Sequence, residues 1–187
     1  MLHPDIEKRN SSIAGNGLFA IRPFIQGTII WHLEPGDRLI TYKELFKLPR
    51  EQRQLPIRYR DNMFIATDGT EYLNHSCDAN TWWTNDALVA SRDIPEGDEI
   101  TLDYGTVDAH LWWNPKWECR CKAKKCRRFI TGRDCLDASF QEKYQDHLPS
   151  WTIIFIQQQS GLYGYLTGYL AWFTGCIRTL RAILNKR

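Results

Sequence analysis

The stretch EYLNHSCDAN, from Glu71 to Asn80, organises this chain together with EGDEITLDYG, from Glu96 to Gly105. The first stretch places an asparagine, a histidine, a serine and a cysteine in succession, and each side chain brings hydrogen-bonding capacity that burial must satisfy. The second stretch is a turn, then an alternating strand, then an acid and a tyrosine beside a glycine. An apolar core needs neither pattern, so we expect the two stretches to meet and to form a site that carries chemistry.

Short β-rich runs separated by Gly and Pro turns lie on both sides of these stretches. One short helix with a polar exit is expected over Thr41–Gln54, and Pro49 limits its length. The expected strands lie at residues 18–20, 25–30, 57–73, 81–94 and 100–102. Many short strands with frequent turns predict a mostly-β domain with short helices.

Gly15 and Gly17 flank Asn16 in a tight turn before the first of these strands. Two interpretations of this glycine pair remain open on the sequence alone. It is either an ordinary hairpin turn or a loop whose bare backbone approaches a ligand.

Composition limits the protein's class. The chain has 187 residues, of which 43% are hydrophobic and 25% charged, as in a globular protein rather than a disordered one. A formal net charge of +2 gives no argument for nucleic-acid binding from bulk charge. We see no secretory leader, so the six cysteines are expected to be metal ligands or buried thiols in a reducing, intracellular compartment.

Three cysteines lie close together in the cationic stretch ECRCKAKKC, at Cys119, Cys121 and Cys126. Neighbouring Lys and Arg favour the thiolate form that binds metal, so the spacing favours a structural zinc site over three free surface thiols. Such a site usually takes four ligands. Cys77, in its polar turn, is the attractive fourth ligand, and Cys135 is the alternative that lies nearer in sequence.

Four blocks of the chain resemble the SET-domain protein lysine methyltransferases with a post-SET zinc motif, and they follow the family's order. These blocks are AGNGLFA (Ala14–Ala20), NHSCDAN (Asn74–Asn80), EGDEITLDYG (Glu96–Gly105) and ECRCKAKKC (Glu118–Cys126). The resemblance covers roughly residues 11 to 131, and four ordered blocks are far more specific than any one of them.

The resemblance implies SET-type β-sheets in which one segment threads through a loop, like a pseudoknot. We expect a SET domain over residues 1–110, a post-SET zinc loop over 111–135 and a C-terminal helical extension over 136–187.

The resemblance also implies roles for particular residues. Tyr104 would stand at the point of methyl transfer. Cys77 would join Cys119, Cys121 and Cys126 on zinc. The residues expected to bind S-adenosylmethionine are Gly15, Asn16, Gly17, Asn74, His75 and Phe129.

The implied function is transfer of methyl groups from S-adenosylmethionine to a lysine of a protein substrate, with a histone as one candidate. The alternative is a catalytically silent SET module that binds a peptide or a partner protein. A histone substrate would place the protein in the nucleus, and another substrate in the cytoplasm.

The chain departs from the family pattern at several positions. Glu71 and Tyr72 stand where an Arg-Phe pair is common, and Lys122 stands where a glycine often follows the second post-SET cysteine. The basic run Lys122–Arg128 has two interpretations, namely contact with an acidic substrate or DNA, or solvated charges beside thiolates. Three tryptophans either wall the lysine channel or bury the zinc loop: Trp112, Trp113 and Trp117.

No residue is charged from Leu148 to Ile177, and a basic end follows. Apolar residues and small residues each recur there at helical spacing, including Gly164 and Gly168 in a G-x-x-x-G pattern. Three interpretations remain open for this helix: contact with a membrane, dimerisation, or cover for the SET core.

Overall fold

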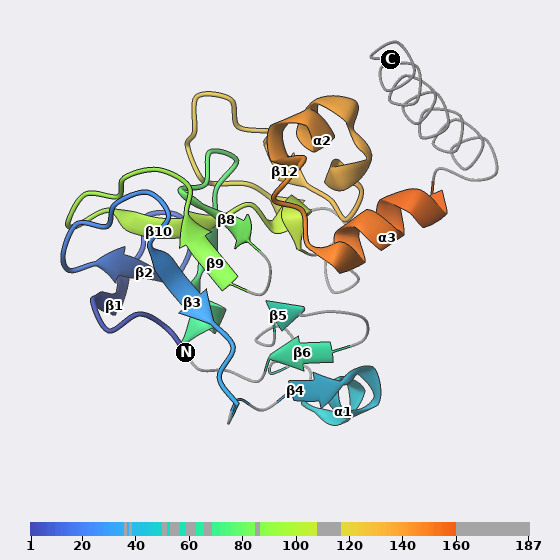
Figure 1. Ribbon diagram of the computed structural model, residues 1–187, viewed down its shortest axis with the longest axis horizontal. Coiled ribbons are helices and arrows are strands. Elements are labelled where there is room, and N and C mark those ends of the chain that lie inside the picture. The colour runs from blue at the N-terminus through green and yellow to red at the C-terminus, as the bar shows by residue number, and fades with distance from the viewer. Residues whose placement is uncertain are drawn as a thin grey trace, which may run out of the picture. The chain divides into compact units, whose positions relative to one another are not determined.

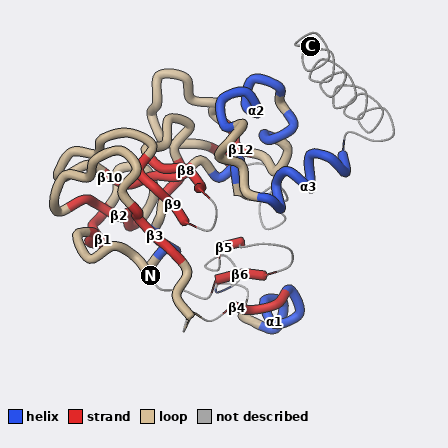
Figure 2. The backbone as a smooth tube through the Cα atoms, viewed as in Figure 1, coloured by secondary structure: helices blue, strands red, loops and turns tan. Residues whose placement is uncertain are grey.

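Short strands in small sheets form most of the structure, a computed structural model that describes residues 1–35, 37, 39–49, 52, 57–58, 63–65, 69–84, 87–107 and 117–159. Figure 1 shows the strands, and Figure 2 marks them against the loops and the few helices. Within the described residues the strand orders are β1-β2-β10-β7, β3-β9-β8, β4-β6-β5 and β11-β12. The prediction of a mostly-β fold with short helices is confirmed.

The elements are short throughout. The strands are β1 Ile6–Asn10, β2 Asn16–Ala20, β3 Ile29–His32, β4 Leu39–Thr41, β5 Ile57–Arg58, β6 Met63–Ile65, β7 Asn74–His75, β8 Thr81–Thr84, β9 Ala87–Ala90, β10 Glu99–Leu102, β11 Trp117–Glu118 and β12 Phe129–Ile130. The helices are α1 Tyr42–Lys47, α2 Ala138–Tyr144 and α3 Ser150–Gln159, with 3-10 turns η2 Thr70–Tyr72, η3 Tyr104–Thr106 and η4 Asp134–Leu136.

β10 is the strand that brings the two opening stretches together. It pairs in parallel with β7, where Thr101 lies opposite Asn74 and Leu102 opposite His75. On its other side β10 pairs antiparallel with β2. The two stretches therefore meet as expected, and the glycine loop before β2 lies in the same sheet.

The core combines side chains of β2, β3, β8, β9 and β10 and is rich in large apolar residues. Trp83 lies edge-on between two other indoles, 5.9 Å from the ring of Trp31 and 5.8 Å from that of Trp151. The indole N–H of Trp151 donates to the carbonyl oxygen of Val107 at 2.9 Å. This bond fixes the first turn of α3 against the segment that follows Tyr104.

α1 is set by local sequence alone. The hydroxyl of Thr41 accepts the backbone N–H of Glu44, and the Glu44 carboxylate accepts the backbone N–H of Thr41, which is a capping box. Leu45 is the buried contact of this helix. α1 ends at Lys47, two residues before Pro49, so the helical part of the predicted segment is short for the reason expected.

The C-terminal segment is described only as far as Gln159, the end of α3. The chain divides into two compact units, Met1–Thr152 and Ile153–Arg187, and the predicted stripes at residues 161–180 lie outside the described residues. No helix among the described residues is long and apolar enough to cross a membrane. The predicted domain boundaries and the three interpretations of this segment stay predictions.

Gly105→Ala should destabilise the fold, because a Cβ built at Gly105 lies 2.9 Å from the ring of Phe140 in α2. Overpacking of this kind typically costs about 1–3 kcal/mol in the free energy of unfolding, which urea denaturation would measure. The double variant Gly105→Ala/Phe140→Leu makes room for the methyl group. If the double variant were no more stable than Gly105→Ala, this contact would not be the cause.

Candidate functional site

Tyr104 begins the 3-10 turn that follows β10, and its side chain is held on three sides. Its hydroxyl donates to the carbonyl oxygen of Leu73 at 2.6 Å. Its ring stacks on Trp117 with a centroid distance of 5.5 Å and an interplanar angle of 22°, while His75 meets it edge-on at 5.4 Å. Because the phenolic proton is used by Leu73, the phenolic oxygen is left as a hydrogen-bond acceptor.

A cavity of about 190 Å³ opens beside this tyrosine's aromatic neighbours. Its lining combines the glycine loop, the asparagine-histidine stretch and the cysteine loop: Ile13, Ala14, His75, Trp117, Glu118, Cys119, Arg120 and Ile130. The expected ligand residue His75 therefore lines a cavity, and so does Ala14, the neighbour of Gly15 in the chain. Phe129 lies next to Ile130 and is largely exposed, so its expected contact with an adenine stays a prediction.

The Asn74 side chain closes the glycine loop onto the sheet. Its amide nitrogen donates to the carbonyl oxygens of Ala14 at 3.1 Å and Asn16 at 2.9 Å, and to Oε1 of Glu99 at 2.7 Å. The hydroxyl of Ser11 donates to the same carboxylate at 2.8 Å. Asn74 thus fixes the shape of the loop, a positioning role that the sequence did not reveal.

The two glycines of the loop serve different needs. Gly15 has φ +48°, a left-handed conformation that glycine adopts without strain. Gly17 does not have a positive φ. A Cβ at Gly17 would collide with the carboxylate of Glu99 and touch Ser11. The bare backbone of Gly17 therefore admits Glu99, while Ile13 and Ala14 line the cavity.

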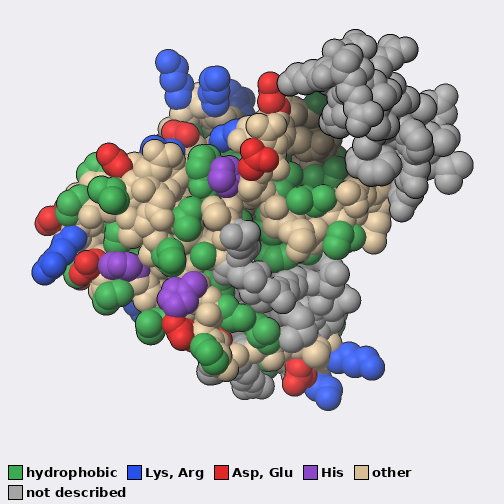
Figure 3. Space-filling view, in the orientation of Figure 1, with side chains coloured by type: hydrophobic (Ala, Val, Ile, Leu, Met, Phe, Trp, Pro, Cys, Tyr) green, Lys and Arg blue, Asp and Glu red, His purple; other side chains and the backbone are tan. Residues whose placement is uncertain are grey.

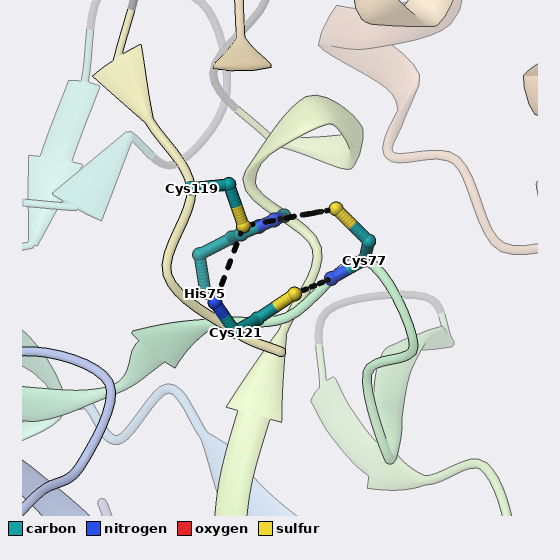
Figure 4. Close-up of side chains that lie close together, drawn as sticks. All are labelled: His75, Cys77, Cys119 and Cys121. Carbon is teal, nitrogen blue, oxygen red and sulfur yellow. Dashed lines mark hydrogen bonds between the residues drawn. The ribbon is translucent and has the colours of Figure 1, made fainter. Parts of the chain in front are cut away.

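Three cysteines and a histidine converge on one point beside the cavity (Figure 4). Each of His75, Cys77, Cys119 and Cys121 brings one ligand atom within 4.8 Å of the others. The Sγ atoms of Cys77 and Cys119 are 3.8 Å apart. Cys135 is buried and is not part of this group, so the structure brings Cys77 to the cysteine loop.

A backbone N–H group points at each of the four cysteine sulfurs. Each accepts a backbone N–H: Cys77 from Arg127 at 3.3 Å, Cys119 from Cys121 at 3.5 Å, Cys121 from Cys77 at 3.4 Å, and Cys126 from Arg128 at 3.3 Å. Burial raises the pKa of Cys77 to about 11. Burial also acts to raise the pKa of Cys121, but the hydrogen bonds from Cys77, Ala123, Cys119 and Cys126 together outweigh it and lower that pKa to about 7. A bound cation would favour the thiolate form at every sulfur, and cysteine sulfurs are a donor set that fits zinc.

His75 faces Cys77 with a protonated nitrogen. Burial lowers its pKa to about 4, so the ring is neutral near pH 7. Its Nδ1 accepts the backbone N–H of Tyr104 at 3.1 Å, which leaves the single ring proton on Nε2. Nε2 lies 3.3 Å from Sγ of Cys77 and donates to it. A nitrogen that carries a proton has no lone pair for a metal, which argues against His75 as a ligand. Cys126 is not in the group that lies within 4.8 Å, so its place as the fourth ligand stays a prediction.

A family model for the SET domain matches residues 15–105 of the chain. The chain carries a SET domain. It is 29% identical over 154 residues to "Histone-lysine N-methyltransferase ash1" of Drosophila melanogaster, an alignment of 70% of this chain and 6% of that protein. It is 35% identical over 79 residues to "Histone-lysine N-methyltransferase, H3 lysine-9 specific KMT1" of Fusarium mangiferae, covering 33% of this chain and 23% of that protein.

A third relative is "Histone-lysine N-methyltransferase 2D" of Homo sapiens, 30% identical over 138 residues. That alignment covers 64% of this chain and 2% of the relative. The chain thus spans less than a quarter of each of these proteins. The comparisons confirm the resemblance to SET-domain lysine methyltransferases.

A buried ion pair ties the cysteine loop to the residue that follows β10 in the SET domain. The carboxylate of Asp103, which is fully buried, accepts two hydrogen bonds from the guanidinium of Arg127, at 2.6 and 2.7 Å. Tyr144 of α2 donates to the same carboxylate at 2.9 Å. Burial alone would raise the pKa of Asp103, but the hydrogen bonds and charge of Arg127 hold it below its ordinary value. Sequence reasoning missed this pair because Arg127 lies in a run of basic residues.

Zinc content should separate the two candidates for the fourth ligand. Cys126→Ser and Cys77→Ser are expected to lower the zinc measured per chain, because each removes a thiolate ligand. His75→Gln should keep its zinc, since His75 donates to a ligand instead of binding the metal. Cys135→Ser is the matched control for loss of a cysteine outside the cluster. Zinc retained by Cys126→Ser but lost by His75→Gln would make His75 the ligand.

Arg127→Met should cost about 3–5 kcal/mol in the free energy of unfolding, because it leaves the buried Asp103 carboxylate without its cation. The matched control is Arg128→Met, whose side chain is exposed. The pKa of Asp103 is lowered in the folded state, so its contribution is present above about pH 4 and is lost as pH falls through the folded pKa. The difference between wild type and Arg127→Met should therefore shrink below pH 4. A constant difference from pH 7 to pH 3 would contradict this account.

Proposed function

We propose that this SET domain transfers methyl groups from S-adenosylmethionine to the side-chain amine of a lysine in a protein substrate. The observation that carries the proposal is Tyr104, whose hydroxyl is held by Leu73 and whose ring stacks on Trp117, a residue of the cavity lining. The named relatives are histone-lysine methyltransferases, which supports a histone as the substrate and the nucleus as the place of action.

The proposed reaction is a direct displacement, so the protein need not form a covalent bond with the substrate. Methyl transfer is an in-line displacement in which charge leaves a sulfonium while the attacking nitrogen gains it, so alignment and desolvation matter most. A free lysine has a pKa of about 10.4, and an aromatic environment that disfavours its charged form helps to supply the neutral amine. Tyr104 and Trp117 stack to form such an aromatic wall. The phenolic oxygen of Tyr104 orients the amine by accepting one of its hydrogens.

The cavity lining is the proposed cofactor site. When bound, S-adenosylmethionine supplies the methyl group. The backbone at Ala14 and Gly15 and the side of the His75 ring would hold it, and Asn74 would keep the loop in shape through its bonds to Ala14 and Asn16. Gly17 and Phe129 would act at the edge of the same site.

Zinc has a structural role in this proposal. It would bind Cys77, Cys119, Cys121 and Cys126 and hold the cysteine loop against the cavity. Through His75, the ligand Cys77 is connected to the backbone of Tyr104. The metal would therefore maintain the geometry of the site without contacting the substrate.

Tyr104→Phe should lower the rate of methyl transfer by about 100-fold, since loss of a group that orients a reactant can cost about that much. The measurement is transfer of labelled methyl from S-adenosylmethionine to core histones by the purified protein. Binding of S-adenosylmethionine, followed by calorimetry, should stay unchanged. Tyr72→Phe, a tyrosine outside the cavity lining, is the control.

Two results would count against the proposal. Unchanged labelling by Tyr104→Phe would remove the role given to Tyr104. Binding of S-adenosylmethionine with no labelling of histones or of any lysate protein would instead support the catalytically silent module.

A further inference from the structure

The cysteine loop concentrates the positive charge of the chain. Residues 117–133 contain seven Lys and Arg residues against one acidic residue, a net charge of +6. Because the whole chain has a formal net charge of +2, the other 170 residues carry a net charge of −4. Bulk charge conceals this asymmetry.

Six of the seven cations of this loop face solvent. Arg127 alone turns inward, to Asp103. We call the other six the basic surface: Arg120, Lys122, Lys124, Lys125, Arg128 and Arg133. Arg120 lies 3.9 Å from the exposed Glu118, and within the described part of the chain no carboxylate comes within 4.0 Å of the remaining five. Lys and Arg side chains gather along the upper edge of the view in Figure 3.

Two members of the basic surface occupy strained backbone. Lys122 has φ +56° and Arg128 has φ +66°, and they are the only non-glycine residues with positive φ among those the structure describes. The left-handed conformation strains the backbone of an ordinary residue, whereas glycine adopts it without strain. Both residues belong to the cysteine loop. Lys122 directly follows Cys121, and Arg128 directly follows Arg127. At both positions the chain carries a cation where glycine would make a more stable loop.

Neutralising the negative charge of the thiolates does not require all six cations of the basic surface. Zinc bound by four thiolates has a net charge of about −2, so at least four of the six cations exceed what the metal centre requires. Their exposure keeps them in solvent, where attraction to the cluster is weak. The surplus positive charge therefore points to a partner that carries negative charge.

We propose that the basic surface binds the phosphate backbone of duplex DNA beside the methyl-transfer site. The six members are all Lys or Arg, the side chains that contact phosphates without reading sequence. Arg120 lies both in the basic surface and in the lining of the cavity, so bound DNA would lie at the rim of the site.

The choice of DNA over an acidic protein rests on the proposed function. A histone is itself basic, and a basic rim would repel it when free. DNA wrapped around the histone would supply the opposite charge. The surface would then favour histone on DNA over a free histone tail.

The double variant Lys122→Gly/Arg128→Gly tests the proposal without endangering the fold. Glycine relieves the backbone strain at both positions, so the melting temperature and the zinc content should be maintained or rise. Binding of a fluorescein-labelled 20-base-pair DNA duplex, followed by anisotropy, should weaken roughly tenfold at 0.1 M salt. The slope of log affinity against log salt should fall by about 2, because two phosphate contacts are lost. The matched control is Lys43→Ala/Lys47→Ala, which removes two exposed charges from α1.

The outcomes separate DNA binding from catalysis. DNA affinity is measured without S-adenosylmethionine or histone, and Tyr104→Phe should bind DNA as the wild type does. Methyl transfer to a histone peptide should be unchanged in the double glycine variant. Wild-type DNA affinity in that variant would overturn the proposal. Tighter binding of a poly-glutamate peptide than of the duplex would overturn it in favour of an acidic protein partner.

Discussion

The Asp103 carboxylate is the constraint on which the rest of the site depends. It is fully buried and ionised, which is costly unless donors surround it. Those donors come from distant parts of the chain, because Arg127 belongs to the cysteine loop and Tyr144 to α2. Since Asp103 directly precedes Tyr104, satisfying this one charge fixes three segments around the tyrosine.

His75 connects the cysteine cluster to the backbone of Tyr104. One ring nitrogen accepts the backbone N–H of Tyr104, and the other donates to Cys77. The sulfur of Cys77 in turn accepts the backbone N–H of Arg127. The thiolate cluster, the buried ion pair and the tyrosine are thus one continuous hydrogen-bonded unit, and low solvent access strengthens each of its bonds. A substitution at any one of these residues is therefore expected to change the positions of the others.

The sequence predicted which residues form the site better than it predicted the interaction partners of those residues. Asn74, His75 and Cys77 stood out because the four successive polar side chains from Asn74 to Cys77 do not suit a core. The structure brings His75 to the cavity, His75 and Cys77 to the thiol cluster, and Asn74 to the glycine loop. The run of basic residues hid Arg127 among solvated cations, because no local pattern shows which of them contacts Asp103, 24 residues away. The contact between Ser11 and Glu99 spans 88 residues, and no local pattern records it.

The position of β10 also decides how this domain can fold. Its partners β2 and β7 lie far from it along the chain, and Cys77 meets Cys119 across 42 residues. Each of these pairings requires closure of a long loop before any contact stabilises it, which slows folding in proteins of high contact order. Because its ligands come together only after these closures, zinc would bind late. Metal uptake would then report completion of the fold rather than its nucleation.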